Sequence, residues 1–134
     1  MSSDEPITIA VQFNQCINRR DIDGLALLMT NDHTFIDSAN HAIHGREKTL
    51  RAWENFFKLF PDYQNIFDRV ILQNGLVTIT GHSTCSDQRL TGPAIWTAKL
   101  KDHTVAEWRV YDDTLETRSQ LGIPMENRTA RGAV

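Results

Sequence analysis

The sequence predicts a single α+β domain. In it, a cone-shaped, strongly curved and mostly antiparallel sheet wraps around three N-terminal helices and is followed by a short C-terminal helix. Two observations lead to this fold class. Hydrophobic residues recur at helical spacing as far as Phe60, and the pattern changes to long strands from Tyr63 onward. Helices followed by meandering strands are typical of α+β domains whose helices cover one sheet face. The length of 134 residues suits one hydrophobic core.

Three helices and one early strand are expected before the main sheet. The first helix has Ile9, Phe13 and Ile17 on one stripe, and Asp21 is a favourable N-cap for the second. The third has a broad aromatic face and ends before Pro61, because proline breaks a helix. The helices are predicted at 6–20, 22–30 and 45–60, the strand at 33–37, and an irregular loop at 38–44.

The second half of the chain predicts two β-hairpins and a short helix. Asn74-Gly75 between two strand-like runs is a strong signal for a tight hairpin turn. Asp113 is expected to cap the helix, with Glu116 three residues later as its reciprocal partner. The strands are predicted at 66–73, 76–85, 93–100 and 104–112, and the helix near 113–121.

Composition and charge exclude several classes of protein. The net charge of −3 at pH 7 argues against nucleic-acid binding, which favours a basic surplus. No apolar run reaches membrane-spanning length, and residues 1–6 do not resemble a signal peptide. Cys16 and Cys85 lie far apart, which predicts reduced thiols in a cytoplasmic protein. Residues 1–124 form the predicted domain, and 125–134 a loosely ordered tail.

Neither a metal nor a nucleotide cofactor is expected. His41 and His44 are three residues apart, but they lie in the predicted loop with no carboxylate at ligand spacing. The sequence has no glycine-rich phosphate loop, no serine nucleophile elbow and no cysteine in a basic setting. Any chemistry would therefore proceed without a cofactor.

Several segments carry a resemblance to a known superfamily. Residues 21–23, 32–37 and 43–47 resemble the first half of the ketosteroid isomerases and SnoaL-like polyketide cyclases. In the last predicted strand, Trp108 precedes Asp112 by four positions, as in SnoaL-like proteins. Over roughly residues 8–122 the chain is similar to the SnoaL-like branch of the nuclear transport factor 2-like superfamily. This resemblance implies the curved-sheet fold, a small-molecule pocket and a homodimer.

The resemblance transfers only in part to catalytic residues. Asp37 matches the general-base aspartate of the ketosteroid isomerases. Their oxyanion-hole tyrosine corresponds to Phe13, and their neutral oxyanion-hole aspartate falls near Trp96. Because a phenyl ring donates no hydrogen bond, steroid isomerisation of that type is not expected. The limonene epoxide hydrolases also differ, since their last-strand aspartate directly follows a Trp-Arg pair, where this chain has Val110.

Asp37 and Asp112 are the predicted catalytic carboxylates. Asp37 ends the early strand beneath the helices, where partial burial would suit it to take a proton; alternatively, it caps the following loop. Asp112 ends the last strand near the pocket mouth, on the same face as Trp108; alternatively, it caps the final helix beside Asp113. The aromatic residues expected to line the pocket, or to share that role with the core, are Phe13, Trp53, Phe57, Trp96 and Trp108.

Two functions stay open. The first is a cofactor-free enzyme that uses Asp37 as general acid or base in the isomerisation or aldol-type cyclisation of a small apolar carbonyl compound. The second is a non-catalytic small-ligand-binding or stress-associated domain of the same fold. Convergent polar groups in the pocket would favour catalysis, and a purely apolar pocket would favour binding. A homodimer is expected through the outer sheet face, which carries Ile95, Thr97, Arg109 and Tyr111.

Overall fold

The computed structural model describes residues 5–123, so the predicted tail at 125–134 lies outside the described residues. The helices are α1 (Glu5–Arg19), α2 (Ile22–Leu28), α3 (Arg46–Leu59) and α4 (Leu115–Leu121), with a single 3-10 turn, η1 (Gln88–Leu90). The strands are β1 (Met29–Ile36), β2 (Ala42–His44), β3 (Gln64–Gln73), β4 (Leu76–Thr84), β5 (Gly92–Lys101) and β6 (Thr104–Asp112).

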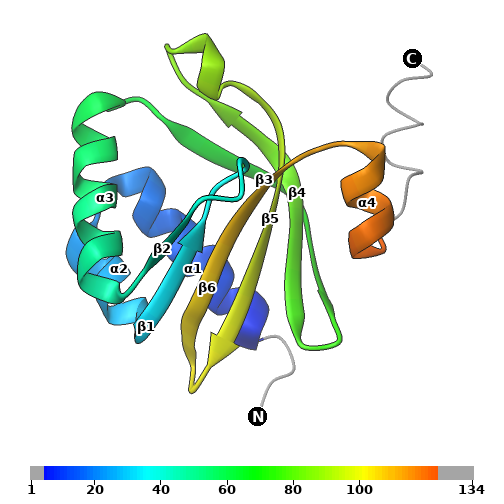
Figure 1. Ribbon diagram of the computed structural model, residues 1–134, viewed down its shortest axis with the longest axis horizontal. Coiled ribbons are helices and arrows are strands. Elements are labelled where there is room, and N and C mark those ends of the chain that lie inside the picture. Colours follow the sequence, from blue (N-terminus) through cyan, green and yellow to red (C-terminus); the bar gives the residue numbers. More distant parts are fainter. Residues whose placement is uncertain (1–4, 124–134) are drawn as a thin grey trace.

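The six strands form one curved, open sheet in the order β2-β1-β6-β5-β4-β3. Neighbouring strands are antiparallel except for β1 and β6, which run parallel. The three N-terminal helices gather on one side of the sheet, whereas α4 lies apart from them on the right of Figure 1. This arrangement confirms the predicted α+β class with a curved, mostly antiparallel sheet.

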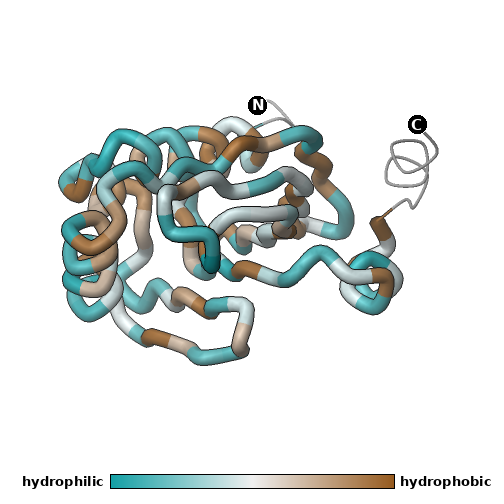
Figure 2. The backbone as a smooth tube through the Cα atoms, turned by 90° about the horizontal axis from the view of Figure 1, so that it is seen from above, coloured by the Kyte–Doolittle hydropathy of each residue, from teal (hydrophilic) through white to brown (hydrophobic). Residues whose placement is uncertain are grey.

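The core lies between the N-terminal helices and the inner sheet face. Phe13 of α1 and Trp108 of β6 are completely buried, and their ring centroids are 4.6 Å apart. Trp96 of β5 is buried beside them and contacts the ring of Phe67. Hydrophilic and hydrophobic residues alternate along much of the chain (Figure 2), which is typical of elements with one buried face. The stripe predicted for the first helix therefore faces the core.

The two long hairpins form as predicted. Asn74 and Gly75 have φ angles of 52° and 79°, the left-handed values that a tight type I′ turn requires. The β5–β6 turn uses the same region, with Asp102 at 51° and His103 at 66°. Asparagine, aspartate and glycine adopt this region at lower cost than other residues. Turn chemistry therefore places these hairpins by local effects alone.

The boundary between the second helix and the first strand was predicted wrongly. The helix ends at Leu28, and Met29 begins β1 with extended backbone angles. Met29 is buried and pairs with Val105 of the parallel strand β6. The methionine fits the helical stripe in the sequence, but its partner in β6 determines its conformation. Helical periodicity does not distinguish a last helical residue from the first residue of a buried strand.

Two further corrections concern short segments. The predicted loop 38–44 contains β2, which pairs with the end of β1 and is too short to show strand periodicity. The cap of α4 is Thr114, whose hydroxyl accepts a hydrogen bond from the Thr117 amide at 3.1 Å. Asp113, the predicted cap, instead accepts hydrogen bonds from Arg118 at 2.7 and 2.9 Å. A buried arginine needs a paired carboxylate, which accounts for the change of role.

Candidate ligand pocket

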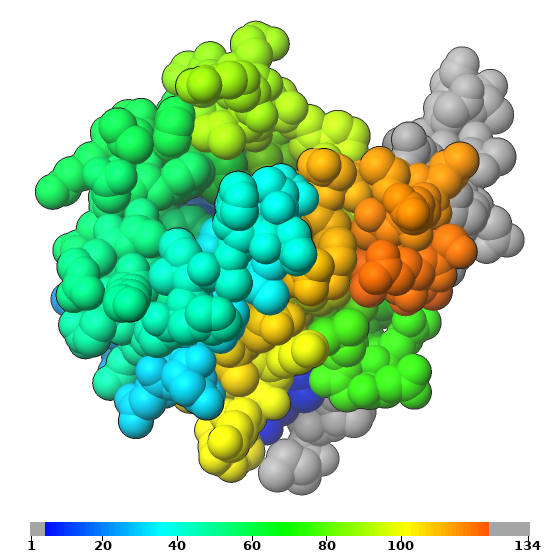
Figure 3. All heavy atoms as spheres, in the orientation of Figure 1, coloured from blue at the N-terminus to red at the C-terminus, as the bar shows by residue number. Residues whose placement is uncertain are grey.

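A cavity of about 380 Å³ opens between α3 and the inner sheet face. Its wall comes from β1, the β1–β2 loop, β2, α3, the residues around the start of β3, η1, β5 and β6. Figure 3 shows a hollow between the green surface of α3, the cyan segment that follows β1 and the yellow-green segment after β4. The volume lies within the range of small-molecule sites, which is about 300–1,000 Å³. We call this cavity the pocket.

The pocket wall is mainly aromatic and aliphatic. All three tryptophans of the chain line it: Trp53 from α3, Trp96 from β5 and Trp108 from β6. Phe35 and Phe56 lie edge-on to Trp53, with ring centroids 5.4 and 5.8 Å from it. Such a wall favours an apolar ligand, because burial of apolar surface supplies most of the binding free energy.

Three other predicted site residues lie outside the pocket wall. Phe13 packs against the rings of Trp108 and His33 and is completely buried in the core. Phe57 packs beside Trp53, and the Arg20 guanidinium lies 5.6 Å from its ring centroid. Asp112 is exposed at the end of β6 and does not line the pocket. Strand alternation places Asp112 on the same face as Trp108, but Asp112 lies at the end of the strand, beyond the residues that line the pocket.

Among the described residues, Asp37 is the only charged side chain in the pocket wall, and amides of the following loop occupy one of its carboxylate oxygens. Its Oδ1 accepts hydrogen bonds from the amides of Ala39 and His41, both at 2.9 Å. Its Oδ2 lies 3.5 Å from Nδ1 of His41, and 42% of the side chain is exposed. The geometry supports the loop-capping role for Asp37, and the burial that would suit it as a base is only partial.

The loop that Asp37 caps, residues 37–41, is here called the mouth loop. It is closed by a backbone hydrogen bond from the Asp37 amide to the His41 carbonyl at 3.0 Å. Asn40 has a left-handed φ of 68°, and its side chain accepts a hydrogen bond from Arg109 at 2.9 Å. The Arg109 guanidinium also lies 4.7 Å from the ring centroid of Tyr111. The mouth loop is therefore tied to β6 by a residue that points away from the pocket.

On the other side of the pocket, Tyr63, Asn65 and Ser83 form a buried polar network. The Ser83 hydroxyl donates to Oδ1 of Asn65 at 2.8 Å, and the hydroxyls of Tyr63 and Ser83 are 3.2 Å apart. Because Ser83 has one proton and gives it to Asn65, Tyr63 is the donor in the second bond. Tyr63 and Asn65 line the pocket, and all three side chains are buried. None of them was predicted as a site residue.

Burial governs the ionisation of this network. Burial raises the pKa of the Tyr63 phenol, while hydrogen bonding with Ser83 and with Asn65 opposes the rise in part. A phenol ionises near pH 10 in water, so at neutral pH Tyr63 is an uncharged hydroxyl. The network therefore presents neutral hydrogen-bonding groups to the pocket.

Two asparagines of α1 fix the backbone of Asn65. Asn18 accepts from the Asn65 amide at 2.8 Å and donates to the Asn65 carbonyl at 2.9 Å. Asn14 donates to the same carbonyl at 3.3 Å. Asn14 and Asn18 are one helical turn apart, and Tyr63 and Asn65 are two residues apart at the start of a strand. These spacings place each pair on one face, and they are the signal in the sequence that could have identified the network.

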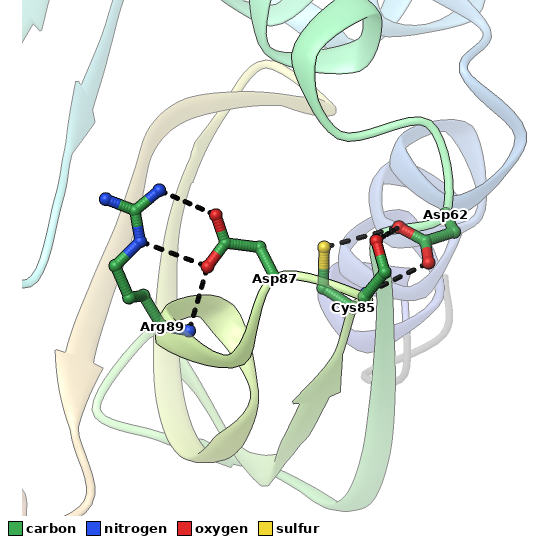
Figure 4. A network of polar contacts seen from close by, with 5 residues as sticks. Asp62, Cys85, Asp87 and Arg89 are labelled. Atoms are coloured by element: carbon green, nitrogen blue, oxygen red, sulfur yellow. Dashed lines mark hydrogen bonds and ion pairs between the residues drawn. The ribbon is translucent and has the colours of Figure 1, made fainter.

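Polar contacts also fix the rim of the pocket (Figure 4). Asp62, which precedes Tyr63, accepts from the Cys85 thiol at 3.3 Å and from the Ser86 amide at 2.9 Å. The hydrogen bond from Cys85 and those from Ser86 lower the pKa of Asp62. Asp87 accepts from the Arg89 guanidinium, which lowers the pKa of this carboxyl to about 2. These bonds hold the segment after β4, and its residue Leu90 completes the pocket wall.

The comparisons with known proteins agree with this geometry. The sequence model of the SnoaL-like domain family matches residues 10–118. The chain belongs to the SnoaL-like domain family. No curated protein matches this SnoaL-like domain significantly. The match spans all the described strands and α3, so the family assignment includes the pocket. The resemblance seen in the sequence is thereby confirmed.

Solved structures show the same fold at low sequence identity. A candidate SnoaL-like polyketide cyclase from Jannaschia sp. CCS1 superposes with a TM-score of 0.73 and 18% identity, covering 92% of this chain and 97% of that one. A candidate ketosteroid isomerase from Kribbella flavida gives 0.68 and 18%, covering 81% and 77%. An epoxide hydrolase of M. tuberculosis, similar to the limonene enzymes, gives 0.71 and 15%, covering 81% and 83%. Relatives with several activities share this fold, so activity has to be argued from the pocket.

Within residues 5–123 of the SnoaL-like domain, no three histidine, cysteine, aspartate or glutamate side chains lie close enough together to hold a metal ion. In the same part of the chain, every helix is too short or too polar to cross a membrane. The polar groups at the pocket include Asp37 of the mouth loop, the Thr49 hydroxyl of α3, and the buried network of Tyr63, Asn65 and Ser83.

Proposed function

We propose that this SnoaL-like domain binds one small, largely apolar molecule in the pocket between α3 and the sheet. The observation that carries the proposal is a cavity of about 380 Å³ walled mainly by aromatic and aliphatic side chains, where Asp37 is the only charged group contributed by residues 5–123. Burial of apolar ligand surface against such a wall contributes roughly 25 cal/mol for each Å² removed from water. The neighbouring folds named as polyketide cyclase and ketosteroid isomerase support a small-molecule role without identifying the ligand.

The tryptophans provide the test, because all three line the pocket. A bound apolar molecule should shift tryptophan emission, and native mass spectrometry should detect any ligand that co-purifies. Ala52 lines the pocket from α3, so Ala52→Phe should fill it and abolish the shift. Arg51→Phe adds the same ring at the neighbouring exposed position and should leave binding intact. Equal binding by wild type and Ala52→Phe would place the ligand elsewhere.

The second candidate function is acid–base catalysis by Asp37, as isomerisation or aldol-type cyclisation without a cofactor. The observation in its favour is that Asp37 lines the pocket while its Oδ2 accepts no backbone hydrogen bond from the mouth loop. A positioned carboxylate of this kind contributes about 10²–10⁴-fold to a proton transfer. Asp112, the other predicted acid, stays a prediction, and its exposed position outside the pocket wall does not support it.

Asp37→Asn separates the two functions. The amide oxygen retains the hydrogen bonds to the mouth loop, so the fold and the ligand affinity should be preserved. Turnover of a carbonyl substrate should fall by roughly 10²–10⁴-fold if Asp37 is the base. Asp102→Asn, which changes an exposed carboxylate in the β5–β6 turn outside the pocket wall, is the matched control and should leave turnover unchanged. A substrate turned over equally by wild type and Asp37→Asn would remove Asp37 from the mechanism.

A homodimer through the outer sheet face is proposed as well, on narrower grounds than the sequence provided. Of the four residues predicted there, Ile95 and Thr97 are already covered within one chain. Arg109 and Tyr111 are partly exposed and stack on each other, and both residue types are enriched at interfaces. Light scattering on a sizing column should give about twice the chain mass of 15.3 kDa. A mass near 15.3 kDa at tens of micromolar protein would contradict the dimer.

A further inference from the structure

We propose that Asn65 and Tyr63 form a preorganised subsite that recognises a neutral oxygen of the ligand, a hydroxyl or a carbonyl. The pocket would then select alcohols and ketones over hydrocarbons of the same shape. This inference rests on the proposed binding function and adds the chemical group that the pocket reads. It assigns recognition to the buried network and not to Asp37 at the mouth loop.

The burial of the network is the first argument. Asn65, Ser83 and Tyr63 are 2%, 6% and 9% exposed, in a wall that is otherwise mainly apolar. Burying three polar side chains adds little stability, because their mutual hydrogen bonds only replace bonds to water. Apolar side chains of similar size would stabilise this part of the fold at least as well. A functional role explains their presence better than a structural one.

The rigidity of Asn65 is the second argument. Its amide and carbonyl groups bond to Asn14 and Asn18 of α1, and its side-chain oxygen accepts from Ser83. These bonds attach the residue to a helix on one side and to strand β4 on the other. A binding group held in this way loses little conformational entropy when the ligand arrives. Asp37, by contrast, belongs to a short loop and is 42% exposed.

The remaining hydrogen-bonding capacity is the third argument. The Asn65 amide nitrogen carries two N–H groups, and the Tyr63 oxygen can take at most one of them. At least one N–H donor is therefore left for a ligand oxygen, in a residue that lines the pocket. The Tyr63 oxygen can in turn accept from a ligand hydroxyl. These groups suit an alcohol, which donates and accepts, and a ketone, which accepts only.

The charge of the pocket indicates that the ligand oxygen is neutral. No lysine, arginine or histidine side chain lines the cavity within the described residues, so a carboxylate or phosphate would have no cation to pair with. A buried anion without a partner is strongly disfavoured. A ligand cation would be drawn to Asp37 at the mouth loop and away from the network. An uncharged oxygen on an apolar skeleton needs no cationic partner and is not drawn to Asp37.

A matched ligand series tests the subsite. Decalin, 2-decalol and 2-decalone share one saturated skeleton, lack aromatic absorbance and can be titrated against tryptophan fluorescence. Wild type should bind the alcohol and the ketone about tenfold more tightly than decalin, the expected worth of one buried hydrogen bond. In Asn65→Leu the three affinities should become equal. Tyr63→Phe removes one oxygen with little change of shape and should reduce the preference for the alcohol.

Thr49→Val is the control. Thr49 also lines the pocket, and its buried hydroxyl has no hydrogen-bond partner among the described residues. Thr49→Val should keep the tenfold preference for the alcohol and the ketone. If this variant lost the preference, Thr49 of α3 would be the group that recognises the ligand oxygen, and the proposal would be overturned. Equal affinities for the three compounds in wild type would overturn the subsite and leave the binding function standing. If wild type binds none of them and no ligand co-purifies, the proposed function fails together with the subsite.

Discussion

The mouth loop and the buried polar network lie on opposite sides of one pocket and differ in how their polar groups are held. In the mouth loop, Asp37 accepts hydrogen bonds from two amides of its own loop, and its side chain is 42% exposed. In the network, Asn65 is 2% exposed and bonded to a helix and a strand distant in sequence. A match to a family motif identified Asp37, whereas the more rigid polar site carries no such motif. Rigidity follows from long-range contacts, which a local motif does not report.

The largest expected change in the free energy of unfolding comes from the inner wall of the pocket. Comparing a variant there with one in the mouth loop tests whether only the wall belongs to the core. Trp108 is fully buried against Phe13, so Trp108→Ala should reduce the free energy of unfolding by about 3–5 kcal/mol. Ser38→Ala, at the mouth loop, should change it by roughly 0.5 kcal/mol or less. Urea unfolding followed by circular dichroism measures both. A loss for Trp108→Ala as small as that for Ser38→Ala would show that the wall can collapse without cost.

A second comparison uses one chemical change in two settings. Ser83→Ala removes the hydroxyl that joins Tyr63 to Asn65 and should cost about 1–3 kcal/mol, because buried partners are left unpaired. Ser86→Ala removes the hydroxyl that donates a hydrogen bond to the exposed carboxylate of Asp62. It should lower the free energy of unfolding by less than about 0.5 kcal/mol. Equal losses in urea unfolding would mean that the network is no more stabilising than the rim.

Buried His33 should make the stability of the fold depend on pH. Burial lowers the pKa of His33, and its hydrogen bond to the Val105 carbonyl only partly offsets this. The unfolded chain, with a histidine pKa of about 6.5, binds more protons below that pH than the folded chain does. Stability should therefore be unaffected above about pH 6.5 and fall as the pH drops toward the lower folded pKa, by at most about 1.4 kcal/mol per pH unit.

One variant tests whether His33 causes this acid sensitivity. His33→Asn removes the buried imidazole and should remove the part of the stability loss below pH 6.5 that this residue contributes. The reference at each pH is the wild-type protein, which retains the imidazole. The profile is measured as urea midpoints at a series of pH values. A profile in His33→Asn identical to that of wild type would show that His33 does not cause the acid sensitivity.

The smallest expected effect concerns the capping carboxylate. Asp37→Ala removes the acceptor for the amides of Ala39 and His41 and should cost roughly 1 kcal/mol, as a lost local cap does. Asp37→Asn retains an acceptor oxygen and should cost less. Hydrogen exchange of the two amides should accelerate in the alanine variant only. Unchanged exchange in Asp37→Ala would show that the carboxylate does not hold the mouth loop.

The sequence by itself determined the features that depend on neighbouring residues. Asn74-Gly75 specified its hairpin, because the left-handed backbone of a type I′ turn is available to these residues at low cost. The stripe of Ile9, Phe13 and Ile17 specified both α1 and its buried face. The order of such elements indicated the fold class, and the motif segments at 21–23, 32–37 and 43–47 indicated the family. Trp53, Trp96 and Trp108 were also expected in the pocket wall, where the structure places them.

Only the tertiary structure decided the roles that depend on distant partners. Ser83 is 18 residues from Asn65, and β4 brings it to the start of β3. The sequence predicts Asp113 as a helix cap, but in the structure its carboxylate accepts hydrogen bonds from Arg118. Polar side chains take the partner that leaves the fewest buried groups unpaired, and that partner is known only when the chain has folded. Periodicity and turn chemistry are local, whereas hydrogen-bond satisfaction is a property of the whole fold.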